Sequence, residues 1–66
     1  MEFSKEDLTE ARWQIDSTLH KLRETIRTLQ EKERPERYKS QITLAERRIQ
    51  AFEIASRLIE EKLAQQ

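Results

Sequence analysis

The best candidate for metal chemistry is a row of three side chains that stand four residues apart: Asp16, His20 and Glu24. Residues four apart share one face of a helix, so these side chains could approach a single ion. Protein zinc sites are built mainly from cysteine and histidine, and this chain has one histidine and no cysteine. We therefore favour ordinary carboxylate–imidazole pairing on a wet helix surface, and we predict neither a metal nor a cofactor.

The sequence contains few residues that could carry out nucleophilic catalysis. A serine nucleophile needs an adjacent base and a group that orients that base, and His20 is the only imidazole in the chain. Glycine-rich phosphate loops are excluded because the chain contains no glycine. The sequence therefore predicts a protein that is not an enzyme. The enzymatic alternative would need a site formed between subunits around Arg12.

One cluster of basic side chains suggests nucleic-acid binding as an alternative function. Acidic neighbours at Glu31, Glu33 and Glu36 weaken its attraction for phosphate. The whole chain balances 13 basic residues against 13 acidic ones, so no net attraction to nucleic acid is expected. We favour the interpretation that the basic cluster is a solvated turn without a nucleic-acid partner. The cluster consists of Lys32, Arg34, Arg37 and Lys39.

Composition predicts one small, helical domain over residues 1–66. Charged residues make up 39% of the chain and glycine is absent, which is typical of long solvated helices. The chain begins without an apolar run, and no window approaches the ~20 apolar residues of a membrane span. We expect a cytoplasmic protein without membrane contact. A chain this short buries a small core and commonly depends on partners.

The first predicted helix runs from about residue 5 to residue 33. Ser4 is suited to cap its free amides, with Asp7 as the reciprocal acid of a capping box and Phe3 and Leu8 as a hydrophobic staple. Pro35 is the only helix breaker, so a turn is expected at about 34–35 and a second helix over about 35–64. A rival start for the second helix is Ser40.

Two long helices joined by a short turn lie antiparallel, as in a coiled-coil-like hairpin. Folding the chain about Arg34 pairs residues whose numbers add to about 68, which places Arg12 and Ser56, the two polar interruptions of the core rows, in one layer. A carboxylate such as Glu53 or Glu60 should then pair with the Arg12 guanidinium. In the alternative, the methylene groups of Arg12 cover the core and its charged end is hydrated. The predicted intrachain core consists of Leu8, Ile15, Leu19, Leu22, Ile26, Leu29, Ile42, Ala45, Ile49, Phe52, Ile59 and Leu63.

A second apolar row on the later helix has no partner within one hairpin. Together with small residues on the first helix, it predicts self-association into a homodimeric four-helix bundle. Between Lys21 and Arg48 nine basic residues accompany five acidic ones, whereas the rest of the chain has four and eight. This asymmetry favours an antiparallel twofold dimer. The predicted interface consists of Leu44, Ala51, Ala55, Leu58, Ala11, Thr18 and Thr25.

Trp13 lies outside the core row. It is either an exposed interaction anchor or packed under the N-terminal segment or against another hairpin, and we favour packing. An unidentified protein partner is a further possibility for this chain.

Two resemblances extend these inferences. The segment Ala11-Arg12-Trp13-Gln14-Ile15-Asp16 resembles the opening of all-helical chorismate mutases, but Leu29 stands where that family has its next arginine, so no activity is carried over. Over nearly its whole length the chain resembles short uncharacterised bacterial proteins with Phe-Ser/Thr-Lys-Glu and Ile-Asp-Ser steps, here residues 3–6 and 15–17, followed by Arg-Ile, alanines and Leu-Ile. That resemblance implies a bacterial helical hairpin and carries no known activity.

Overall fold

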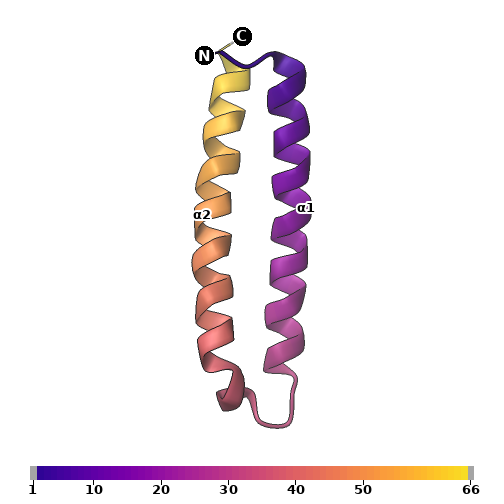
Figure 1. The fold of residues 1–66 in the computed structure, drawn as a ribbon, viewed down its shortest axis with the longest axis vertical. Helices are drawn as coiled ribbons and strands as arrows, with labels where there is room; N and C mark the ends of the chain where they lie inside the picture. The colour runs from indigo at the N-terminus through magenta and orange to yellow at the C-terminus, as the bar shows by residue number, and fades with distance from the viewer. Residues whose placement is uncertain (1, 66) are drawn as a thin grey trace.

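The chain folds as two antiparallel α-helices connected by a short turn (Figure 1). The computed structural model describes residues 2–65. Helix α1 spans Lys5–Gln30, a 3-10 helix η1 spans Pro35–Tyr38, and helix α2 spans Lys39–Ala64. The two ends of the chain lie at the same end of a rod of 48 × 17 × 15 Å (Figure 1). This confirms the predicted all-α hairpin.

Helix α1 begins with the capping box that its sequence predicts. The backbone N–H of Asp7 donates to the Ser4 hydroxyl at 3.0 Å, and the backbone N–H of Ser4 donates to the Asp7 carboxylate at 3.2 Å. These two bonds satisfy amides that have no partner within the helix. Phe3 stays 57% exposed beside this cap, so it shields little of Leu8.

Helix α1 ends at Gln30, three residues before the predicted end at Glu33. The backbone N–H of Glu31 donates to the carbonyl of Arg27, and that of Lys32 donates to Leu29, which closes the last turn. The next core position after Leu29 would fall at Glu33, whose charge gains nothing from burial against the other helix. Residues 31–34 are therefore free to reverse the chain.

Helix α2 begins in a way that lies between the two predicted alternatives. A helical turn starts at Pro35, as preferred, but this turn is a 3-10 helix and α-helical geometry begins only at Lys39. Arg34 is held at φ −129° and ψ 77°, outside the helical region, as expected for a residue before proline. Pro35 occupies the first turn, where its missing N–H costs no hydrogen bond.

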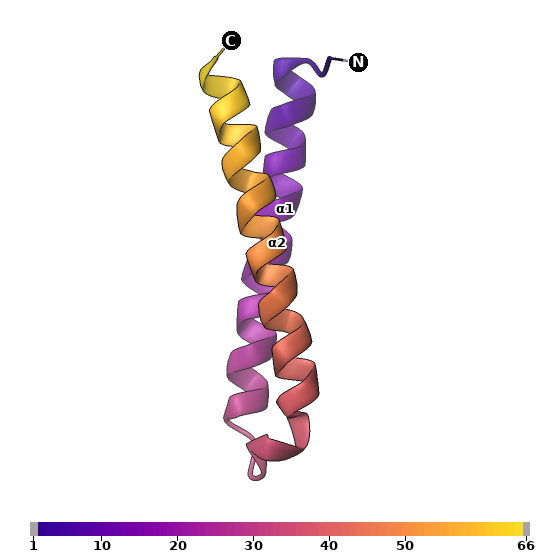
Figure 2. The same cartoon turned by 90° about the vertical axis from the view of Figure 1, so that its left-hand side faces the viewer.

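The two helices run side by side and cross at a shallow angle (Figure 2). The core is a thin row of side chains between them. Only Leu8, Leu19 and Ala45 are buried among the described residues. The other predicted core residues are half-buried, because a two-helix layer covers each side chain on one side only. The half-buried members are Ile15, Leu22, Ile26, Leu29, Ile42, Ile49, Phe52, Ile59 and Leu63.

Candidate functional site

Ion pairs and hydrogen bonds connect the two helices along one side of the hairpin, which we call the ion-pair flank. The Arg23 guanidinium contacts the Glu53 carboxylate at 2.9 Å across the helices. Nearer the chain ends, Arg12 contacts Glu60 at 3.4 Å. The flank consists of Arg12, Asp16 and Arg23 of α1 with Glu53, Ser56 and Glu60 of α2.

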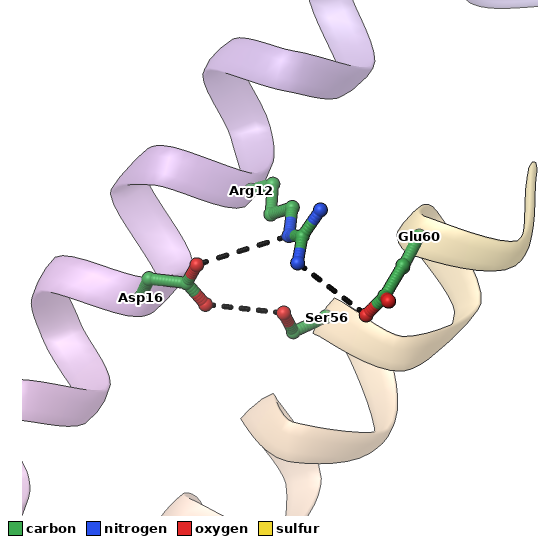
Figure 3. Close-up of polar contacts among 4 residues, drawn as sticks. All are labelled: Arg12, Asp16, Ser56 and Glu60. Atoms are coloured by element: carbon green, nitrogen blue, oxygen red, sulfur yellow. Dashed lines mark hydrogen bonds and ion pairs between the residues drawn. The ribbon is translucent and has the colours of Figure 1, made fainter. Parts of the chain in front are cut away.

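Asp16 links the polar groups of this flank into one network (Figure 3). One of its oxygens lies 3.8 Å from Nε of Arg12, and the other accepts a hydrogen bond of 3.1 Å from the hydroxyl of Ser56. Arg12 therefore has carboxylates on two sides, Asp16 from its own helix and Glu60 from the other. Its side chain is 37% exposed, so the predicted carboxylate partner and the predicted contact with water are both present.

The register of the helices differs from the predicted one. Ser56 bonds to Asp16 and not to Arg12, and Arg12 reaches Glu60, one turn farther along α2 than the predicted Ser56. The residue numbers of the Arg12–Glu60 and Asp16–Ser56 pairs add to 72, and those of the Arg23–Glu53 pair add to 76, whereas about 68 was predicted. The turn is the cause: residues 31–34 and the 3-10 helix take up more chain than a turn at 34–35 would. Arg12 and Ser56 thus share one network without lying level.

All of these charged groups are accessible to water, which limits what they contribute. The side chains of the Arg23–Glu53 pair are 53% and 55% exposed. Exposed ion pairs contribute only about 0–1 kcal/mol each. An open groove beside them is lined by residues of both charge signs, including Asp16, Arg23 and Glu53. Such a groove favours neither anions nor cations, and the ion pairs beside it connect the two helices.

The predicted interface residues lie on the opposite side, which we call the apolar flank: Ala11, Thr18 and Thr25 of α1 with Leu44, Ala51, Ala55 and Leu58 of α2. Two residues along an α-helix correspond to about 200° around its axis. Thr18 and Thr25 stand two residues after Asp16 and Arg23, and Ala55 stands two residues after Glu53. Thr18, Thr25 and Ala55 therefore lie on the side away from the ion pairs. Leu58 lies farther around α2, where it and Ile54 also line the groove beside the ion pairs.

Large side chains remain in water on and beside the apolar flank. Leu44 is 49% exposed and Leu58 is 60% exposed. Ile54, which is not among the predicted interface residues, is 55% exposed. Its position was readable from the spacing, because Ala51, Ile54 and Leu58 continue the alternation of three and four residues.

The threonine hydroxyls of this flank form hydrogen bonds with backbone carbonyls of their own helix. The hydroxyl of Thr18 donates to the carbonyl of Gln14 at 3.0 Å, and that of Thr25 donates to Lys21 at 2.9 Å. Each hydroxyl is therefore satisfied within its own helix, a common arrangement for helical threonine. A neighbouring molecule could cover this flank without leaving these donors unpaired.

The basic cluster lies at the turn, where Lys32, Arg34 and Arg37 line a shallow hollow with Glu33 and Tyr38. Within residues 2–65, ion pairs involve only the arginines of helix α1, so the tip cations are unpaired. Lys39 lies beside this hollow, at the start of helix α2.

The remaining candidates are the row Asp16, His20 and Glu24 and the side chain of Trp13. In the described part of the chain, no three His, Cys, Asp or Glu side chains are grouped to hold a metal, and Asp16, His20 and Glu24 form no such group. Trp13 is 64% exposed, so the first of the two predicted packing arrangements, cover by the N-terminal segment, is wrong. Its ring lines a hollow with Lys5, Glu6, Thr9 and Glu10.

Comparisons with known protein families, curated proteins and solved structures give no match to this chain. Among residues 2–65, no helix combines the length and the apolar character needed to cross a lipid bilayer.

Proposed function

We propose that this protein is a non-enzymatic helical interaction module that self-associates, with two hairpins packing through their apolar flanks into a four-helix bundle. The observation that carries the proposal is the exposure of Leu44 and, farther along α2, of the neighbouring Ile54 and Leu58, on a hairpin whose own core is thin. Contiguous exposed apolar residues rimmed by polar ones mark interaction surfaces.

The exposed area of the lone hairpin supports the same proposal. A compact monomer of 8.0 kDa exposes about 4,450 Å², whereas this chain exposes 5658 Å². The excess of about 1,200 Å² exceeds the ~800 Å² that each partner buries in a standard stable interface. A second hairpin laid along the first would remove such an excess.

Light scattering after size-exclusion chromatography tests the proposal directly. At micromolar concentration we expect twice the 8.0 kDa mass of the chain. A folded species of 8.0 kDa that stays helical across the concentration range would contradict it.

The unpaired cations at the tip favour a second candidate, a small regulator that contacts nucleic acid. If this is the function, salt-dependent retention on a DNA or RNA column should disappear when Arg34, Arg37 and Lys39 are changed to glutamine. A matched control makes the same three charge changes at Lys5, Arg57 and Lys62, away from the tip. Equal retention of both variants would remove this candidate.

A further inference from the structure

The apolar flank has an internal symmetry that specifies how a second copy would lie on it. On α2 its row reads Leu44, Ala51 and Leu58, with seven residues on either side of Ala51. An interface with twofold symmetry requires that if one residue contacts another, the reverse contact also occurs. An antiparallel copy of α2 meets this requirement with Ala51 against its own copy and Leu44 against Leu58.

Helix α1 carries a matching pattern on the same flank. Ala11, Thr18 and Thr25 are likewise spaced by seven residues on either side of a central small side chain. An antiparallel copy of α1 would set Thr18 against Thr18 and Ala11 against Thr25. These side chains are small and their hydroxyls are satisfied internally, so two α1 helices can approach closely.

The two centres of symmetry lie at nearly the same height in the hairpin. The short side chains of Asp16 and Ser56, whose numbers add to 72, place Ala51 level with about residue 21, three residues from Thr18. The longer side chains of Arg23 and Glu53, whose numbers add to 76, allow up to four residues more. Three residues correspond to about 4.5 Å along a helix, less than one turn. A single twofold axis perpendicular to the rod can therefore serve both helices.

The distribution of charge along the hairpin also favours the antiparallel arrangement. The level of this axis divides the hairpin into residues 19–50, with nine basic and five acidic side chains, and the remainder, with four and eight. An antiparallel copy lays the basic half of one hairpin over the acidic half of the other. A parallel copy would instead set basic tip beside basic tip and α1 against the α2 of the other copy.

We infer that the dimer is antiparallel, with its twofold axis passing near Thr18 and Ala51. This inference rests on the self-association proposed above and adds its orientation and register. The bundle would then present one basic tip at each end and an ion-pair flank on each outer face.

Cysteine cross-linking tests the register, because the natural chain contains no cysteine. A disulfide forms when two Cα atoms approach within about 7 Å. Under mild oxidation, Ala51→Cys and Thr18→Cys should each give mostly covalent dimers. Gln50→Cys, at the same level but about 100° around α2, is the matched control and should stay largely unlinked.

Mixed samples extend the test to pairs of positions. Leu44→Cys and Leu58→Cys, one of them tagged, should link to each other more than either links to itself. Linking of Ala51→Cys to Lys21→Cys, with none in Ala51→Cys alone, would overturn the inference in favour of the parallel arrangement.

The mass of each unoxidised variant separates failure of the register from failure of self-association. A dimeric mass without the expected links would overturn the antiparallel register alone. A monomeric mass for the unsubstituted chain would overturn the self-association and the register together.

Discussion

At the scale of single residues, Arg12 shows how a charged side chain occupies a core position in this hairpin. It stands in the row between Leu8 and Ile15, yet its guanidinium lies at the rim, between the carboxylates of Asp16 and Glu60. The arginine methylenes can cover apolar neighbours while the charge stays hydrated. Its contribution is therefore expected to come from packing more than from ion pairing.

Replacing Arg12 with leucine should stabilise the hairpin by about 1 kcal/mol, because burying apolar area gains more than two exposed ion pairs lose. Urea unfolding followed by circular dichroism at fixed protein concentration measures the change. Arg23→Leu is the control, since a leucine at that more exposed position gains little. A clear loss of stability specific to Arg12→Leu would show that the ion pairs hold the helices together.

Ser4 is expected to contribute more to stability than any other exposed serine. Changing it to alanine removes one bond of the capping box and should lower the free energy of unfolding by about 1 kcal/mol. Thermal unfolding of Ser4→Ala beside Ser17→Ala provides the measurement. Ser17 lies exposed inside α1, where alanine is the better helix former, so its variant should be neutral or slightly stabilised. Equal melting temperatures would argue against the cap.

At the scale of the elements, the helices depend on each other more than on their own propensities. Each has 26 residues and buries one narrow row against the other. A layer this thin supplies little stability to a chain of this size. Helix content should therefore be sensitive to a single charge in the core row.

Changing Ile49 to aspartate should abolish most of the helical circular dichroism signal, because it places a charge without a partner between the helices. Gln50→Asp adds the same charge at the neighbouring exposed position and should preserve the signal. An Ile49→Asp chain that stays helical and keeps its mass would show that the core row has been assigned to the wrong face.

At the scale of the whole molecule, the two flanks divide the surface by chemistry. One side holds cross-helix ion pairs, and the other carries alanines, threonines and leucines, with Arg48 and Lys62 seven residues on either side of Ala55. A second copy on the apolar flank would leave every ion pair of the other flank in place. Substitutions on the two sides should therefore have different effects on mass.

Changing Ala55 to glutamate should shift the mass from dimer toward monomer while reducing helix content less than Ile49→Asp does. The charge falls on the half-buried edge of the apolar flank, where a second hairpin would have to desolvate it. Arg57→Glu, two residues away, is the control and should remain dimeric. Light scattering on a dilution series distinguishes the two, and an unchanged mass for Ala55→Glu would place the interface elsewhere.

Trp13 should remain in water when the protein dimerises. It stands two residues after Ala11, about 200° around α1 from the apolar flank. Quenching of its fluorescence by acrylamide should therefore be the same in the unsubstituted protein and in the Ala55→Glu variant. Stronger quenching in the dissociated variant would mean that the Trp13 face takes part in the interface.

The sequence by itself determined the parts of this protein that depend on local chemistry. The start of α1 follows from the reciprocal groups of Ser4 and Asp7, and the break at Pro35 follows from its ring. The membership of the core row follows from spacing, because apolar side chains at steps of three and four share one helix face. Ile54 was equally visible in that spacing, although we did not include it.

Only the tertiary structure decided how the helices are aligned. The register depends on how many residues the turn uses, and the early end of α1 at Gln30 together with the 3-10 helix moved it by about one helical turn. That shift replaced the expected layer of Arg12 and Ser56 with a network centred on Asp16. Turn length is set by the distance the chain must cross between two packed helices, and residue spacing within one helix does not contain that distance.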